Sequence, residues 1–161
     1  MWDISLGLGI SALPTRSSLV LFRTLGFTEL INVSGSDTSS LYTASDLAGM
    51  VYADFLFADV FSSSNEAATI IEKMSPRGMH EIKSAVVHAA ACLREQRRVM
   101  VFCHLGVGRS PAVSVMALML ARHCSAEEAV HVVMRLRPKA AISGAVVAFA
   151  KKLCAELVVG Q

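Results

Sequence analysis

The chain has 161 residues, of which 53% are hydrophobic, and it carries a formal net charge of +2. This length and apolar content predict one domain with a substantial core, without repeats or low-complexity tails. The mild positive charge gives no indication of nucleic-acid binding, and the longest apolar run, residues 112–121, is too short to span a bilayer.

Cysteine and histidine usage indicates reduced thiols and no metal centre. The beginning of the chain, Met-Trp-Asp, lacks the basic and long apolar segments of a signal peptide, so we expect a cytoplasmic protein. The cysteines show no metal-ligand pairing; they are Cys92, Cys103, Cys124 and Cys154. Four histidines are scattered over expected helices and are interpreted as surface or core-edge residues: His80, His88, His123 and His131.

The first half of the chain predicts short strands that alternate with helical segments and polar loops. Gly26 is expected to cap the first helix. The expected elements are a strand at 4–9, a helix from a turn at 14–18 to about 25, a strand at 28–33, a loop at 34–40, a helical turn at 44–50 and a strand at 52–57.

The second half is dominated by helices. Residues 62–76 are Ser-rich and then weakly helical, and they could fold over a pocket. The expected elements that follow are an amphipathic helix over about 79–95, a strand at 99–102, a helix at 110–123, a helix from a Ser125/Glu128 capping box to about 136, and a last helix to about 158. This order predicts a single α/β domain with a central, mostly parallel sheet flanked by helices on both faces.

The stretch from Val99 to Pro111 reads Val-Met-Val-Phe-Cys-His-Leu-Gly-Val-Gly-Arg-Ser-Pro, which is a strand, a tight loop and the beginning of a helix. Backbone N–H groups between Cys103 and Arg109, together with the helix N-terminus, can surround an oxyanion. Gly106 and Gly108 permit the unusual dihedral angles of such a loop, and Arg109 offers a planar fork to two oxygens. The same donors favour the thiolate of Cys103 at the floor of the loop.

This arrangement of Cys103, five residues, Arg109 and Ser110, between a hydrophobic strand and a helix, resembles the signature of the cysteine-dependent phosphatases, specifically the small dual-specificity type. The string Gly-Phe-Thr-Glu-Leu-Ile-Asn-Val near the N-terminus and the string Ala-Glu-Glu-Ala-Val…Arg-Leu-Arg-Pro after the signature are also similar to that family. The resemblance therefore covers most of the chain and implies one phosphatase-like domain over residues 1–161.

The resemblance implies a role for each residue of the signature. Cys103 would attack as a nucleophile and form a phosphocysteine, and Ser110 would cap the helix and assist the breakdown of that intermediate. Arg109 would bind the phosphate together with the loop residues His104, Leu105, Gly106, Val107 and Gly108. His104 either lines the pocket or faces solvent. This chemistry needs no metal and no cofactor.

Two departures from the family pattern concern the general acid and the residue before the nucleophile. The family places an aspartate on a loop after the strand that precedes the long helix, which implies that Asp59 is the acid and then the base. Because the gap between Asp59 and Cys103 is longer than usual, Asp54 and Glu66 remain alternatives. Phe102 stands where the family usually has a histidine, which predicts a less stabilised thiolate and a slower enzyme.

The expected substrates are phosphotyrosine or phosphoserine/threonine in proteins, since the loop has no lysine for a highly charged head group. The alternatives are a small phosphorylated metabolite, a lipid head group or a nucleotide, a catalytically silent phosphate-binding module, and a sulfurtransferase or arsenate reductase. Cys92 or Cys124 could form a protective disulfide with an oxidised Cys103. We expect no nucleic-acid partner and no membrane insertion, and the oligomeric state stays open.

Overall fold

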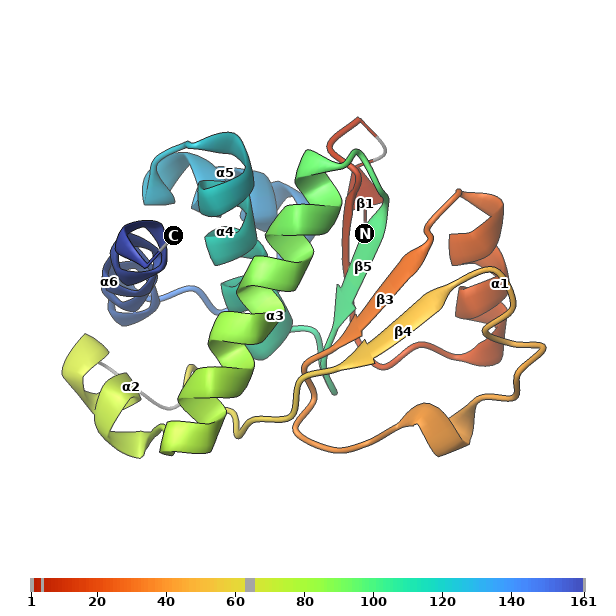
Figure 1. Cartoon of the computed structure of the whole chain (residues 1–161), viewed down its shortest axis with the longest axis horizontal. Helices are drawn as coiled ribbons and strands as arrows, with labels where there is room; N and C mark the ends of the chain where they lie inside the picture. Colours follow the sequence, from red (N-terminus) through yellow and green to blue (C-terminus); the bar gives the residue numbers. More distant parts are fainter. Residues whose placement is uncertain (1, 4, 63–65, 161) are drawn as a thin grey trace.

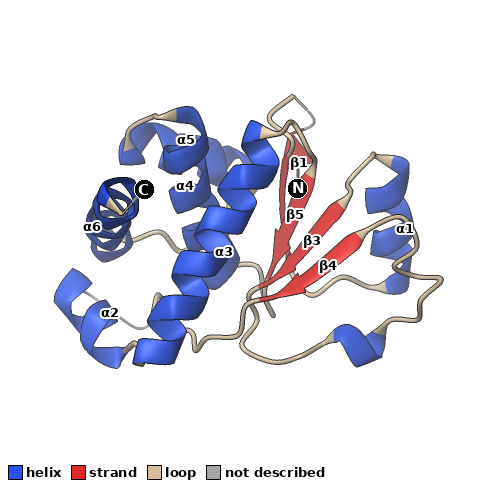
Figure 2. Cartoon of the chain, in the orientation of Figure 1, coloured by secondary structure: helices blue, strands red, loops and turns tan. Residues whose placement is uncertain are grey.

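A five-stranded sheet runs through the middle of the molecule, with the strand order β1-β2-β5-β3-β4 (Figures 1 and 2). The structure is a computed structural model that describes residues 2–3, 5–62 and 66–160. The strands are β1 (Trp2–Asp3), β2 (Leu8–Ser11), β3 (Glu29–Asn32), β4 (Val51–Asp54) and β5 (Val99–Phe102). Among the strands of the described residues, β1 alone pairs antiparallel, which confirms the predicted mostly parallel sheet.

Helices cover both faces of the sheet, as predicted. They are α1 (Arg16–Thr24), α2 (Ala67–Lys73), α3 (Pro76–Arg94), α4 (Arg109–Arg122), α5 (Ala126–Leu136) and α6 (Gly144–Val159), with a 3-10 helix, η1, at Ser39–Leu41. In Figure 2, α1 lies on one side of the sheet and α2 to α6 lie on the other. We call these the thin side and the thick side. None of the helices in the described ranges has the length and apolar content needed to cross a bilayer.

Strand β5 divides its side chains between the two sides, because successive residues of a strand point to opposite faces. Val99, Val101 and Cys103 belong to the large core cluster of the thick side. Met100 and Phe102 belong to a smaller cluster with residues of α1. The nucleophile candidate therefore faces the thick side, and the residue before it faces the thin side.

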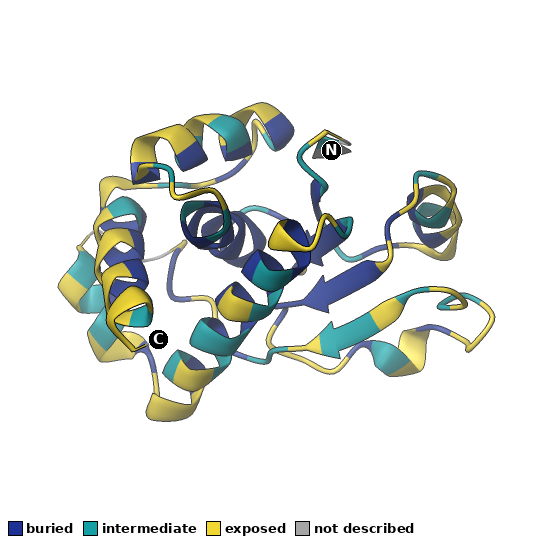
Figure 3. Ribbon diagram, turned by 45° about the horizontal axis from the view of Figure 1, so that its top comes forward, coloured by how far each residue is buried: buried dark blue, intermediate teal, exposed yellow. Residues whose placement is uncertain are grey.

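Helix α4 is the central element of the thick side. It is buried over most of its length, as the dark blue ribbon in Figure 3 shows, and it packs against α3, α5 and α6. A helix that is apolar on all sides is stable only when neighbours cover every face. We call residues 103–108 the signature loop. Because α4 begins at Arg109, directly after this loop, the packing of α4 fixes the loop at one end.

Two predicted strands have different bounds in the structure. The strand predicted at 4–9 begins only at Leu8, because Gly7 adopts φ +72° in a turn whose amides at Ser5 and Leu6 donate to the Asp3 carboxylate. Ile4 lies outside the described residues. The strand predicted at 52–57 leaves the sheet after Asp54, and the Leu56 amide then donates to the Glu81 carboxylate, 3.3 Å away.

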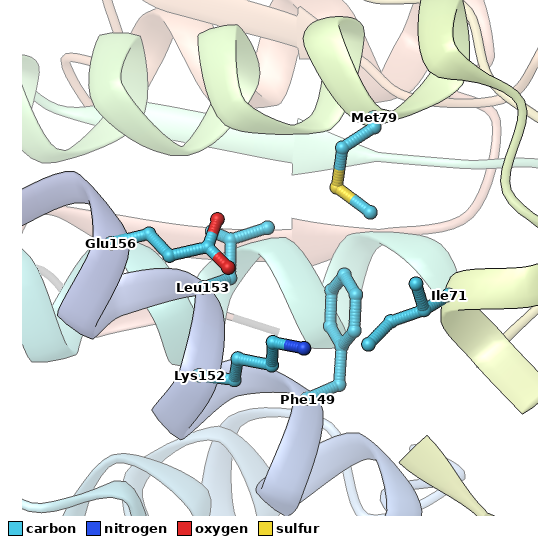
Figure 4. A pocket seen from close by; sticks show the side chains of 6 residues that line it. All are labelled: Ile71, Met79, Phe149, Lys152, Leu153 and Glu156. Carbon is cyan, nitrogen blue, oxygen red and sulfur yellow. The ribbon is translucent and has the colours of Figure 1, made fainter. Parts of the chain in front are cut away.

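The helical part of segment 62–76 does not cover the signature loop. Helix α2 packs against α6, and Pro76 begins α3 after the Ser75 cap. A small pocket of about 80 Å³ lies between α2, α3 and α6, and Figure 4 shows the side chains that line it. Its lining side chains are mostly apolar and come from outside the signature loop: Ile71, Met79, Phe149, Lys152, Leu153 and Glu156. Residues 63–65 of this segment lie outside the described ranges.

Candidate active site

The signature loop closes around the sulfur of Cys103. This side chain is only 2% exposed. Its Sγ accepts a hydrogen bond from the Gly106 amide at 3.2 Å and lies 3.3 Å from Ser110 Oγ. The amide hydrogen of Gly106 points at the sulfur, and the Ser110 hydroxyl lies within hydrogen-bond distance of both this sulfur and, at 3.5 Å, the Ser11 carbonyl.

Three carbonyl groups of the loop are held on the outside by residues far along the chain. Arg137 donates from Nη2 to the carbonyl of Leu105 at 2.8 Å and from Nε to that of Gly106 at 2.9 Å. The Ala141 amide donates to the Val107 carbonyl at 2.8 Å. In a trans peptide the N–H points opposite to the C=O, so the next three amides turn inward. Arg137 is absent from the predicted site residues, because no local pattern in the sequence signals this contact.

Gly106 allows the loop to lie against the end of β2. It adopts φ +66°, and a Cβ at this position would stand 2.7 Å from backbone atoms of Ser11 and Ala12. Backbone cannot move aside as a flexible side chain can, so a larger residue would open the loop.

Arg109 lies under the site and is held there by backbone carbonyl groups. The side chain is buried, and its Nη1 donates to the carbonyl groups of Ser34 and, at 3.2 Å, Phe57. Its Nε is buried and has no hydrogen-bond partner among the described residues. Since an unpaired buried N–H costs about 1–3 kcal/mol, an oxyanion that accepts from it would be bound favourably.

Asp59 stands at the rim of the loop, close to Arg109. Its Oδ2 lies 3.7 Å from Arg109 Nε and accepts from Ser62 Oγ at 3.1 Å. Its Oδ1 accepts from the amides of Phe61 and Ser62, each at 3.2 Å. A Cβ added to Gly108 would meet the carboxylate at 2.9 Å, so the carboxylate and the loop are in close contact.

The two alternative acids lie elsewhere. Asp54 is part of β4, where its Oδ1 accepts from Asn32 Nδ2 at 2.7 Å. Glu66 is the N-cap residue of α2, the helix that packs on α6. Of the three acidic candidates, Asp59 is therefore the one that the structure places against the signature loop.

The fold is shared with solved structures of phosphatases and of a phosphatase-like protein. Human DUSP28 is 17% identical, with 100% of both chains covered and a TM-score of 0.72. Tk-PTP in its active form is 22% identical, with 96% of this chain and 99% of that chain covered and a TM-score of 0.68. Human tyrosine phosphatase-like serine/threonine/tyrosine-interacting protein is 15% identical, with coverages of 97% and 96% and a TM-score of 0.71.

The chain has the fold of the small dual-specificity phosphatases. This confirms the resemblance at the level of the fold. No protein-family model and no curated protein matches the sequence.

Within this dual-specificity phosphatase fold, the rim of the loop is open. Leu105 is 72% exposed, and the exposed His104 places Nε2 3.3 Å from Ser36 Oγ. His104 therefore lies at the edge of the loop, where it faces solvent. Phe102 is buried on the thin side, with its ring centroid 6.1 Å from that of Tyr52. A phenyl ring there supplies packing and no hydrogen bond.

The fold also separates Cys103 from its expected disulfide partners. All four cysteines are free. Cys92 lies near Glu29, at the amino end of β3, and Cys103 lies beyond the carboxyl end, a strand length of about 10 Å away. Cys124 follows α4, whose 14 residues rise about 21 Å from the loop. Neither can reach Cys103, so the predicted protective disulfide is wrong for this conformation.

Proposed function

We propose that this protein is a cysteine-dependent phosphatase that hydrolyses phosphate monoesters through a phosphocysteine intermediate. The observation that carries the proposal is the buried Nε of Arg109, which has no hydrogen-bond partner among the described residues, close to a loop whose Gly106 amide donates to Cys103 Sγ. Such an arrangement offers donors to the equatorial oxygens of a phosphoryl group and leaves the sulfur in line with the scissile bond.

In the first step, the Cys103 thiolate attacks phosphorus and the P–O bond to the leaving group breaks. Asp59, protonated at the start of this step, gives its proton to the leaving oxygen. The position of its carboxylate 3.7 Å from Arg109 Nε supports this role, because Arg109 would hold the phosphoryl group. The products of the step are a phosphocysteine and a neutral alcohol or phenol.

In the second step, water attacks phosphorus and the S–P bond breaks. Asp59 accepts the proton of the water, and inorganic phosphate is formed. Ser110 Oγ, 3.3 Å from Sγ, donates a hydrogen bond to the departing thiolate and makes it a better leaving group.

We further propose phosphotyrosine or phosphoserine/threonine in proteins as the substrate class. The open rim with its exposed Leu105 suits a phosphorylated side chain that projects from a peptide. The loop itself contributes no lysine, and its one arginine is already buried under the site. A multiply phosphorylated head group would find few cations there.

Steady-state hydrolysis of an aryl phosphate, with chelator present and between about pH 5 and pH 8, tests the reaction. We expect Cys103→Ser to lower kcat by about 10⁴-fold or more and Asp59→Asn by about 10²-fold or more. Asp54→Asn is the matched control and should stay within about threefold of the wild type. A wild type that binds vanadate without turnover would instead be a silent phosphate-binding module.

Substrate class is tested by comparing kcat/KM for phosphotyrosine peptides, phosphothreonine peptides, a nucleoside monophosphate and an inositol phosphate. The proposal expects the highest value for a peptide. A higher value for either small phosphate, in an enzyme that depends on Cys103, would overturn the protein-substrate assignment and leave the mechanism intact.

A further inference from the structure

Three side chains that can ligate a metal lie together at the end of the sheet opposite to Cys103. Glu29 begins β3, and His88 and Cys92 are one turn apart on α3. A carboxylate oxygen, an imidazole nitrogen and the sulfur all lie within 4.8 Å of one another. The two α3 residues face the same way because residues i and i+4 of a helix share one face.

The carboxylate of Glu29 is buried and only half used. The residue is 2% exposed, and Arg97 Nη1 donates to Oε1. Oε2 has no hydrogen-bond partner among the described residues, and neither does the buried His88 Nε2 that lies 3.5 Å from it. Buried polar atoms without hydrogen bonds lower the stability of the folded state. A cation that bound both Glu29 Oε2 and His88 Nε2 would therefore stabilise the fold.

We propose that Glu29, His88 and Cys92 form a binding site for a divalent transition metal, with Zn²⁺ as the ion that fits best. Oxygen, nitrogen and sulfur donors together favour this ion over magnesium or calcium, which prefer oxygen alone. Three protein ligands leave one tetrahedral position for water. The His88 side chain is 34% exposed, so the cluster lies close to the surface.

The cluster is close to the required geometry. Zinc–ligand bonds of about 2.0–2.3 Å place tetrahedral donors about 3.3–3.8 Å apart. Glu29 Oε2 and His88 Nε2 already lie 3.5 Å apart, and all three donors lie within 4.8 Å of one another. Arg97 holds Glu29 by its other oxygen, and the Phe55 ring packs 5.7 Å from the His88 ring, which restrains both ligands. The Cys92 thiol loses one proton to solvent when the metal binds.

Such a metal would connect β3 to α3 and act on stability, far from the proposed chemistry. His88 is predicted from the sequence to be a surface or core-edge residue, since no third ligand stands at metal-ligand spacing near it; Glu29 lies 59 residues away along the chain. Only the fold brings that residue to the helix.

Titration of the full-length protein with Co²⁺, a spectroscopic substitute for Zn²⁺, tests the site. We expect a thiolate-to-cobalt absorption band in the near ultraviolet, displaced by Zn²⁺, and a Zn²⁺-dependent rise in Tm. Cys92→Ser should abolish the band, and His88→Gln should weaken Co²⁺ binding by about tenfold or more. His88→Gln changes a half-exposed side chain, so it keeps the test valid if Cys92→Ser does not fold.

Three controls separate this site from other thiols and histidines. Cys103→Ser removes the proposed nucleophile and should keep both the band and the rise in Tm. Cys154→Ser removes another buried thiol, and His80→Gln removes an exposed imidazole on the same helix; both should bind Co²⁺ as the wild type does.

The proposal is overturned if the wild type gives no thiolate band, if Cys103→Ser alone removes it, or if His88→Gln binds Co²⁺ with unchanged affinity. In the first case the cluster is an ion pair among Arg97, Glu29 and His88. In the second case the metal occupies the signature loop.

Discussion

The two sides of the sheet contribute differently to this molecule. The thick side contains Cys103, the helix that begins at Arg109, and the segment whose Arg137 and Ala141 hold the loop carbonyls. The thin side packs α1 and the 39–50 segment on Met100 and Phe102 and supplies no group of the proposed reaction. Changes to the thick-side groups that contact the signature loop should therefore alter activity together with stability, and changes on the thin side should alter stability alone.

The largest effect that would sharpen this comparison is expected from Arg137→Ala. The substitution removes both hydrogen bonds to the carbonyl groups of Leu105 and Gly106, so the loop amides lose their inward orientation. A displacement of about 1 Å at a catalytic loop costs about 10²-fold in rate, and we expect a loss of that size in kcat/KM for an aryl phosphate. The neighbouring Arg135→Ala, which affects only an exposed pair with Asp3, is the control and should leave the rate unchanged. Equal kcat/KM values for the wild type, Arg137→Ala and Arg135→Ala would show that the loop keeps its shape without the two hydrogen bonds from Arg137, which we call the Arg137 clamp.

A smaller effect is expected from Gly35→Ala compared with Gly49→Ala. Both glycines have a positive φ, +83° and +77°, so alanine strains the backbone by about 1–2 kcal/mol at each position. At Gly35 the new Cβ would also stand 2.7 Å from Arg109 Nη1 and 2.8 Å from the Phe57 carbonyl, whereas at Gly49 it meets nothing within 4 Å. We expect Gly35→Ala to lower kcat/KM by about tenfold and Gly49→Ala, on the thin side, to leave it unchanged. Urea unfolding of both variants measures the loss of stability that the positive φ causes at each position. An equal loss of kcat/KM in Gly35→Ala and Gly49→Ala would contradict the expected difference between the two sides.

The smallest effect is expected from a pair of phenylalanine substitutions, one on each side. The ring centroid of Phe149, a side chain labelled in Figure 4, lies 5.6 Å from that of Phe61. Phe61 follows Asp59 by two residues, and its ring packs on that of Phe57. Phe22 packs 6.1 Å from Phe27 on the thin side. Phe149→Leu and Phe22→Leu should each lower the free energy of unfolding by about 1–3 kcal/mol. Only Phe149→Leu should also lower kcat, by about threefold, because it loosens the segment that carries Asp59. If kcat falls equally in both, the two sides are not separable.

Local patterns predicted the parts of this fold that depend on neighbouring residues. Strand β5 has the predicted bounds, and the Ser125/Glu128 capping box is present at the beginning of α5. Gly26 has φ +80° directly after the end of α1, as a cap glycine should. In each case the determining contacts lie within a few positions along the chain.

The supports of the site could not be predicted in this way. Arg137 reaches carbonyl groups 31 and 32 residues away, and Arg109 donates to Ser34, 75 residues away. These hydrogen bonds depend on where the fold brings the segments, and no spacing in the sequence announces them. The predicted strand 52–57 failed for a related reason: Phe57 leaves the sheet, and its carbonyl accepts from Arg109.

The clamp between Arg137 and the signature loop also fixes an order of events during synthesis. A ribosome makes Cys103 before it makes Arg137 and Ala141, and those two residues shape the loop amides. A nascent chain that ends before residue 137 therefore carries the thiol without its oxyanion cradle. The proposed activity is therefore expected only after residues 137–141, close to the end of the 161-residue chain, have been made and have folded against the loop.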